Sequence, residues 1–148
     1  MKNVQIFCQY CEDIRKELDG KISLMGILPG ALNIPAKDNA VISKICTFVS
    51  VVVHPENLQS ALTIQILWND EILRESPVPD DLIQHLETAT PEKHSQRIAR
   101  SVINFVAELD DINVQGGGRL RARVKVDDTY VEAISLQVLT GQDQADQS

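Results

Sequence analysis

The chain has 148 residues, of which 43% are hydrophobic and 24% charged, and its formal net charge is -7 at pH 7. This length accommodates one domain with a full core, and the composition is typical of a folded protein rather than of a disordered or membrane-spanning one. The acidic balance argues against a nucleic-acid partner, because proteins bind phosphate backbones mainly through cationic side chains.

The first predicted element is a strand near the amino terminus, where Val4, Ile6 and Cys8 alternate with the side chains between them. A period of two places such residues on one face of a strand. Polar residues soon interrupt this segment, so it does not have the apolar core of a signal peptide. No stretch approaches the about 20 apolar residues that cross a bilayer, and we expect a cytoplasmic protein without a membrane segment.

Three cysteines, Cys8, Cys11 and Cys46, lie in or beside apolar strand patterns. An odd number of cysteines in this setting favours reduced, buried thiols over a disulfide framework. The spacing Cys8-x-x-Cys11 could begin a zinc site, but the other cysteine and the histidines do not complete a standard set of four ligands. We therefore predict no metal and no cofactor.

Charged residues crowd the stretch that follows Cys11, including Asp13, Arg15 and Glu17. Glu12, Asp13 and Glu17 could form an acid–base or metal-binding set, but a site normally needs groups that converge from several segments. We predict instead that Asp13, Arg15 and Glu17 form a polar joint between two strands, with Arg15 paired to one of the two carboxylates.

The same stretch carries a phrase of two acids and an arginine, followed by glycine, lysine and a second glycine. It consists of Cys11, Glu12, Asp13, Ile14, Arg15, Gly20, Lys21, Ser23, Leu24 and Gly26. This phrase resembles that of an uncharacterised bacterial and phage family of small domains of unknown function. The resemblance implies a β fold and allows a role in phages or mobile elements. It implies no catalytic residue.

Two further strands and one helix are predicted in the middle of the chain. Residues Ile45–Val53 are apolar at nearly every position, which is typical of a central strand covered on both faces, whereas Leu62–Trp68 alternates as a half-buried strand does. Pro79 is followed by two acids and an apolar run through Leu86, which favours a short helix with acids at its positive end.

The segment Arg97–Leu109 fits both a helix and a strand, and we predict a strand because it leads directly into a strand pair. That pair is a hairpin in which Val126 opposes Tyr130 and Ala122 opposes Ile134, and Asp127–Thr129 form a three-residue connection. In this register the outer residues of the first strand have no carboxylate directly opposite them. They form a basic stripe, which consists of Arg119, Arg121, Arg123 and Lys125.

Together these patterns predict an all-β fold, an immunoglobulin-like β-sandwich of about seven or eight strands with a short helical insertion. Residues 1–140 form its single domain, and residues 141–148 form a disordered tail. The predicted function is a non-enzymatic interaction or structural module that binds a protein partner, with the basic stripe as the candidate surface. A homo-oligomer is compatible with these patterns. The alternative is a small metal-dependent hydrolase that uses loop aspartates, namely Asp13, Asp80, Asp110 or Asp127.

Overall fold

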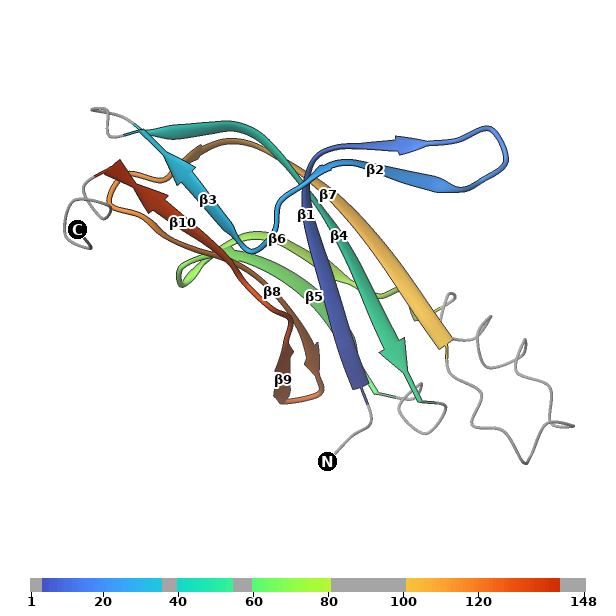
Figure 1. The fold of residues 1–148 in the computed structure, drawn as a ribbon. Coiled ribbons are helices and arrows are strands. Elements are labelled where there is room, and N and C mark those ends of the chain that lie inside the picture. Colours follow the sequence, from blue (N-terminus) through green and yellow to red (C-terminus); the bar gives the residue numbers. More distant parts are fainter. Residues whose placement is uncertain (1–3, 36–39, 55–59, 81–100, 142–148) are drawn as a thin grey trace, which may run out of the picture.

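A computed structural model describes residues 4–35, 40–54, 60–80 and 101–141, which form ten strands in two sheets (Figure 1). The strands are β1 (Val4–Lys16), β2 (Ile22–Ile27), β3 (Ala31–Ile34), β4 (Val41–Val53), β5 (Leu62–Trp68), β6 (Glu71–Pro77), β7 (Ser101–Asn113), β8 (Gly118–Val126), β9 (Thr129–Glu132) and β10 (Leu136–Thr140). One sheet has the order β2-β1-β4-β7. The other has the order β3-β10-β8-β5-β6, with β9 also paired to β8.

The two packed sheets confirm the predicted all-β sandwich, although the strands outnumber the seven or eight expected, because short segments such as β3 and β9 also pair. An immunoglobulin-like architecture stays a prediction. The predicted helix after Pro79 and the predicted tail fall almost entirely outside the described residues. From Ser101 onward the ambiguous segment is the strand β7, as predicted. Among the described residues, no helix has the length and apolar character needed to cross a membrane.

The core lies between the sheets and consists of alternate side chains of the long strands. Val49, Val51 and Val53 of β4 are buried, as are Leu120, Ala122, Val124 and Val126 of β8. Tyr10 links the two layers, because its hydroxyl lies 3.1 Å from the carbonyl oxygen of Leu120 and 3.2 Å from that of Ile134. A buried hydroxyl needs such a partner, so Tyr10 joins β1 to the second sheet at a defined position.

The prediction that β4 is covered on both faces was wrong. Its inward residues are buried, but Phe48, Ser50 and Val52 on the other face are only half-buried. A continuous β-branched run fits a doubly covered strand and a strand with an apolar outer face equally well, because neither produces alternation.

Near one end of the β4–β7 pair, the spacing of the inward-facing residues changes, but the pairing register stays the same. Pairing is continuous from Val53–Ser101 to Lys44–Asp110 and resumes at Ile42–Ile112 with the same offset. Inward residues are two apart along most of both strands, but three apart between Ile42 and Ile45 and between Leu109 and Ile112. At this point Asp111 has a positive φ of 53°. The matched irregularities keep both sets of apolar residues in the core.

The terminal hairpin differs from the predicted register at its turn. Val126 pairs with Thr129 across a two-residue connection, and Lys125, not Val126, lies opposite Tyr130. Further along, Leu136 opposes Leu120 as predicted. The two registers differ by one residue, which is absorbed between Glu132 and Leu136, where the chain leaves the strand. Ile134 is therefore 86% exposed instead of opposing Ala122 in the core.

Candidate interaction surfaces

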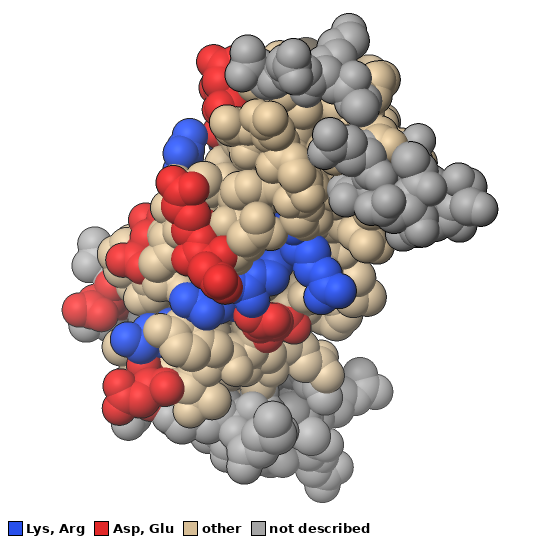
Figure 2. All heavy atoms as spheres, turned by 90° about the vertical axis from the view of Figure 1, so that its left-hand side faces the viewer, with Lys and Arg blue, Asp and Glu red and all other residues tan. Residues whose placement is uncertain are grey.

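The basic stripe lies on the outer face of the β3-β10-β8-β5-β6 sheet. Arg119 is exposed, whereas Arg121, Arg123 and Lys125 are half-buried. Figure 2 shows basic side chains in a band across this face, with acidic side chains directly beside them. The expectation that no carboxylate lies opposite the stripe was wrong, because the two-residue turn places Glu132 opposite Arg123.

Arg121 is the most heavily bonded member of the stripe. Its Nη1 lies 2.8 Å from Glu132 Oε1, and its Nη2 lies 3.4 Å from Asp70 Oδ1. Its Nε and Nη2 both donate to the backbone oxygen of Asn69, at 3.1 and 2.8 Å. Arg121 therefore ties the turn between β5 and β6 to β9, and its charge is already balanced within the chain.

Arg123 and Lys125 share one aromatic neighbour. The Arg123 guanidinium lies 4.0 Å from the centre of the Tyr130 ring, and the Lys125 ammonium lies 5.9 Å from it. Arg123 Nε also donates to Gln65 Oε1 at 2.7 Å, while the amide nitrogen of Gln65 donates to Glu75. These contacts form a polar network across β6, β5, β8 and β9, in which cation–π contacts cover part of the positive charge.

We expect Arg121→Glu to lower the free energy of unfolding by about 1 to 2 kcal/mol, because it removes the bonds to Asn69 and places a third acid beside Glu132 and Asp70. Urea denaturation monitored by circular dichroism measures this change. The matched control is Arg119→Glu on the same strand face, since the Arg119 side chain forms no ion pair with a described residue; we expect less than about 0.5 kcal/mol there. Equal losses in the two variants would contradict the assigned role of Arg121.

The aspartates of the alternative enzyme hypothesis do not come together. Asp13 lies 3.1 Å from the Lys44 ammonium, which holds the pKa of Asp13 below its usual value, and Asp110 pairs in register with Lys44 on the other side. Asp127 accepts a bond from the amide of Ala61, which directly precedes β5. This position is about 20 Å along the strand from Trp68, at the other end of β5. Asp80 follows β6 and is exposed. Within the described ranges, no three His, Cys, Asp or Glu side chains are grouped to hold a metal ion.

The predicted polar joint occupies the far half of the β1–β2 hairpin, which extends away from the rest of the sandwich in Figure 1. Arg15 Nε lies 3.6 Å from Asp13 Oδ2, and both side chains are more than one-third exposed. Glu17 begins the turn, where its amide donates to the Lys21 carbonyl oxygen at 2.8 Å. Exposed pairs of this kind contribute little stability, so the hairpin depends mainly on its backbone pairing.

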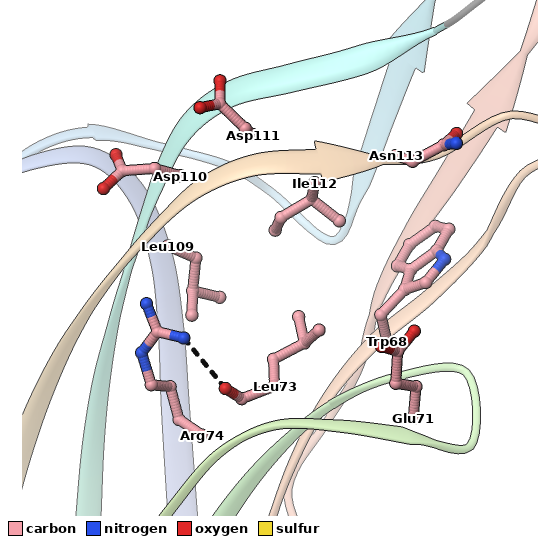
Figure 3. Close-up of a pocket in the computed structure, with 9 residues that line it drawn as sticks. All are labelled: Trp68, Glu71, Leu73, Arg74, Leu109, Asp110, Asp111, Ile112 and Asn113. Carbon is pink, nitrogen blue, oxygen red and sulfur yellow. Dashed lines mark hydrogen bonds between the residues drawn. The ribbon is translucent and has the colours of Figure 1, made fainter.

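A pocket of about 280 Å³ lies between the β5–β6 hairpin and the end of β7. Leu73, Leu109 and Ile112 line its apolar part, beside Trp68 (Figure 3). The same view shows the carboxylates of Asp110 and Asp111 pointing away from these apolar side chains. The pocket therefore has an apolar interior and a charged rim, and its two aspartates do not converge on a common point.

The three cysteines are free thiols. Cys11 and Cys46 face each other in register and are buried, and Cys11 Sγ donates to the Cys46 carbonyl oxygen at 3.8 Å. Burial raises the pKa of Cys11 and of Cys46, and it raises that of Cys8 to about 12. Thiols with raised pKa values are poor nucleophiles at neutral pH, so these cysteines fit a structural role.

An apolar patch that the sequence did not reveal lies on the outside of the β2-β1-β4-β7 sheet, around the polar pair Ser50 and Asn104. Phe7, Val102 and Val106 are 57%, 52% and 44% exposed. Half-buried Phe48 and Val52 lie between them in register, with Phe48 opposite Val106 and Val52 opposite Val102. We call these five residues the outer apolar face. Large exposed patches of this kind on a soluble protein commonly mark interaction sites.

The outer apolar face ends at an open strand edge. β7 has 13 residues and pairs only with β4, whereas the other strands with a single neighbour, β2, β3, β6 and β9, have 6, 4, 7 and 4 residues. Natural proteins usually keep edge strands short or place proline on them, as at Pro77, the last residue of β6. In the described part of the chain, β7 is thus the longest edge available to another strand.

No protein-family model matches the chain, and no curated protein matches it.

Proposed function

We propose that this chain is a non-enzymatic β-sandwich module that binds a protein partner, and that the partner adds an extended strand to β7 while it covers the outer apolar face. The observation that carries this proposal is the coincidence of a long edge strand, bonded on its outer side by Arg74 only at Glu108 among the described residues, with exposed Val102 and Val106 on the same strand. Strand addition of this type gains affinity from main-chain hydrogen bonds and specificity from alternate side chains.

The basic stripe is the weaker candidate surface. Arg121 and Arg123 already bond Glu132, Asn69 and Gln65, so a partner would have to replace these contacts to use them. Arg119 and Lys125 retain their charge for a partner, and for that reason the stripe provides the comparison surface in the experiment below.

The setting of this function is also a proposal. The phrase around Asp13 and Arg15 resembles that of the uncharacterised bacterial and phage family, and it supports a bacterial or phage protein. The three free thiols agree with a cytoplasmic location, where thiols stay reduced.

The experiment is a differential capture from an extract of the source organism with three forms of the full chain. The face variant carries Val102→Lys and Val106→Lys, and the stripe variant carries Arg119→Glu and Lys125→Glu. A protein retained by the wild-type chain and the stripe variant, but reduced at least about ten-fold on the face variant, is the expected result. Loss on the stripe variant with retention on the face variant would contradict the proposal. Urea denaturation shows whether each variant is folded.

A further inference from the structure

We infer that the pocket between the β5–β6 hairpin and the end of β7 binds a small organic cation, whose apolar body enters the pocket and whose charged nitrogen stays at the rim. This site is separate from the proposed partner surface, because it uses neither the outward backbone groups of β7 nor the outer apolar face. The module would then have a small-molecule ligand in addition to a protein partner.

An irregularity in β7 builds one wall of the pocket. Leu109 and Ile112 both face the core, and two acids, Asp110 and Asp111, stand between them where a regular strand would have one residue. Asp111 accommodates the additional residue with its positive φ of 53°. The strand therefore presents two apolar side chains to the pocket and two adjacent carboxylates to its rim (Figure 3).

The interior of the pocket is apolar and limited in size. Leu109, Ile112 and Trp68 are buried, and Leu73 is half-buried on the side of β6. The volume is about 280 Å³. An apolar cavity of about 150 Å³ binds benzene, and drug-sized ligands occupy about 300 to 1,000 Å³. The pocket thus suits one ring with a short extension, and an aromatic ring has an aromatic neighbour in Trp68.

The rim of the pocket carries more negative than positive charge. Glu71, Asp110 and Asp111 are exposed, and none of them forms an ion pair with a described residue. Arg74 is the one basic side chain among the described residues of the lining, so three carboxylates accompany one guanidinium. This excess attracts a cation and repels an anion of the same shape.

The cations near the rim are bonded to other groups. Arg74 donates to the carbonyl oxygen of the residue before it at 2.9 Å and to that of Glu108 at 3.4 Å. Lys44 lies opposite Asp110 in register, but its ammonium lies 3.1 Å from Asp13 and 3.8 Å from Glu108. The rim carboxylates therefore keep their charge for a ligand.

The direction of the carboxylates decides where the charge of the ligand lies. Asp110 and Asp111 point away from the apolar side chains in Figure 3, so the interior offers no partner for a buried ammonium group. A ligand with its nitrogen at the end of a short chain avoids this cost, because the nitrogen stays hydrated at the mouth while the apolar body is buried.

The first test uses the fluorescence of Trp68, the only tryptophan in the chain. Three probes with the same phenethyl body are titrated into the full chain up to about 20 mM, namely phenethylammonium, the uncharged phenethyl alcohol and the carboxylate hydrocinnamate. We expect a saturable change, with a dissociation constant at least about five-fold lower for the ammonium than for the alcohol and the weakest binding for the carboxylate. No saturable change with the ammonium, or equal affinity for the three probes, would overturn the inference.

The second test removes two charges from the rim. Asp110→Asn combined with Asp111→Asn keeps the side-chain shapes, and asparagine tolerates the positive φ at position 111. The affinity for phenethylammonium should fall at least about three-fold, while that for phenethyl alcohol stays the same. The matched control is Glu17→Gln combined with Asp128→Asn, which removes two exposed charges at distant turns and should leave both affinities unchanged. Equal losses in the two double variants would overturn the site.

These tests and the capture experiment fail separately. A chain that captures its partner through β7 but gives no titration with phenethylammonium would refute this inference alone. A chain that binds the ammonium probe as expected, but whose captured protein is lost only on the stripe variant, would contradict the proposed function alone. The probe series on the wild-type chain also decides the inference if a double variant does not fold.

Discussion

Raising the pH from about 9 to about 11 should lower the free energy of unfolding by about 3 kcal/mol or more. Burial raises the pKa of Cys8 to about 12, whereas a thiol in the unfolded chain titrates near its ordinary value. Below that ordinary value both states hold the proton and the folded state keeps its full stability. Above it the unfolded chain releases the proton while the folded chain retains it, so stability is lost until the pH reaches the folded pKa.

Other buried groups act in the same direction. Burial also raises the pKa values of Tyr10, Cys11 and Cys46, so each adds to the loss once the pH exceeds its unfolded value. Urea denaturation in the presence of a reductant, repeated at each pH, measures the slope. Cys8→Ala is the matched control and should make the decline between pH 9 and 10 smaller, leaving the contributions of Cys11 and Cys46, which titrate over the same range in the unfolded chain. A stability that stays constant up to pH 11 would contradict the assigned burial.

Replacing Ile66 by alanine should lower the free energy of unfolding by about 3 to 4 kcal/mol. Ile66 has no exposed surface, and it pairs with Ala122 of β8 in the middle of the second sheet. Because Ala122 is small, the Ile66 side chain fills most of the core space at this position. The alanine variant therefore leaves a cavity that the surrounding backbone cannot close. Chemical denaturation gives the change directly.

Ile72 provides the control for Ile66, because it lies on the same β5–β6 hairpin but is 46% exposed. Ile72→Ala should cost less than about 1 kcal/mol, since much of the side chain is in water already. If the two alanine variants lost similar amounts of stability, the inward orientation of Ile66 would be wrong.

Strands with strict alternation were predictable from the sequence. Leu62–Trp68 and Gly118–Val126 both showed a period of two, and both are strands. Gly118–Val126 has one face in the core, but the expectation that Leu62–Trp68 is half-buried was wrong, because Gln65 and Leu67 on its other face are only 5% and 1% exposed. The sequence keeps a period of two because a register slip of one residue would turn the apolar side chains of the buried face toward water. The choice of a strand for β7 was right for a related reason: Ile103, Ala107 and Leu109 alternate toward the core.

Features that depend on neighbouring strands were not predictable. The register of the terminal hairpin was inferred by aligning apolar residues, which assigned Ile134 to the core, but the actual two-residue turn brings Tyr130 over Arg123 and Lys125 instead. The offset is absorbed between Glu132 and Leu136, where no sequence pattern signals an irregular segment. Matching apolar residues across the two strands therefore could not distinguish a two-residue turn from a three-residue turn.

The candidate site was missed for a similar reason. The run Ile45–Val53 is apolar on both sides of the strand, which predicted cover on both faces, and the exposure of Phe48 and Val52 follows only from their place in a two-layer fold. The alternation of Val102 and Val106 with buried residues was visible, but its position at an edge depends on strand order. The arginine-rich alternation of β8 was conspicuous by comparison, although Arg121 is paired with Glu132 and Asp70 and Arg123 is bonded to Gln65.

Hydrogen–deuterium exchange in β7 tests most directly whether this strand receives a partner. The Glu108 carbonyl oxygen accepts a bond from Arg74 of β6, so by alternation the amides of Val102, Asn104 and Val106 also point away from β4 and should exchange rapidly in the free monomer. The amides of Ile103, Phe105 and Ala107 are directed toward β4 and provide the internal control. In the complex with the captured protein, the three outward amides should become protected to the level of the control amides. Unchanged, rapid exchange at all three in the bound state would contradict the account.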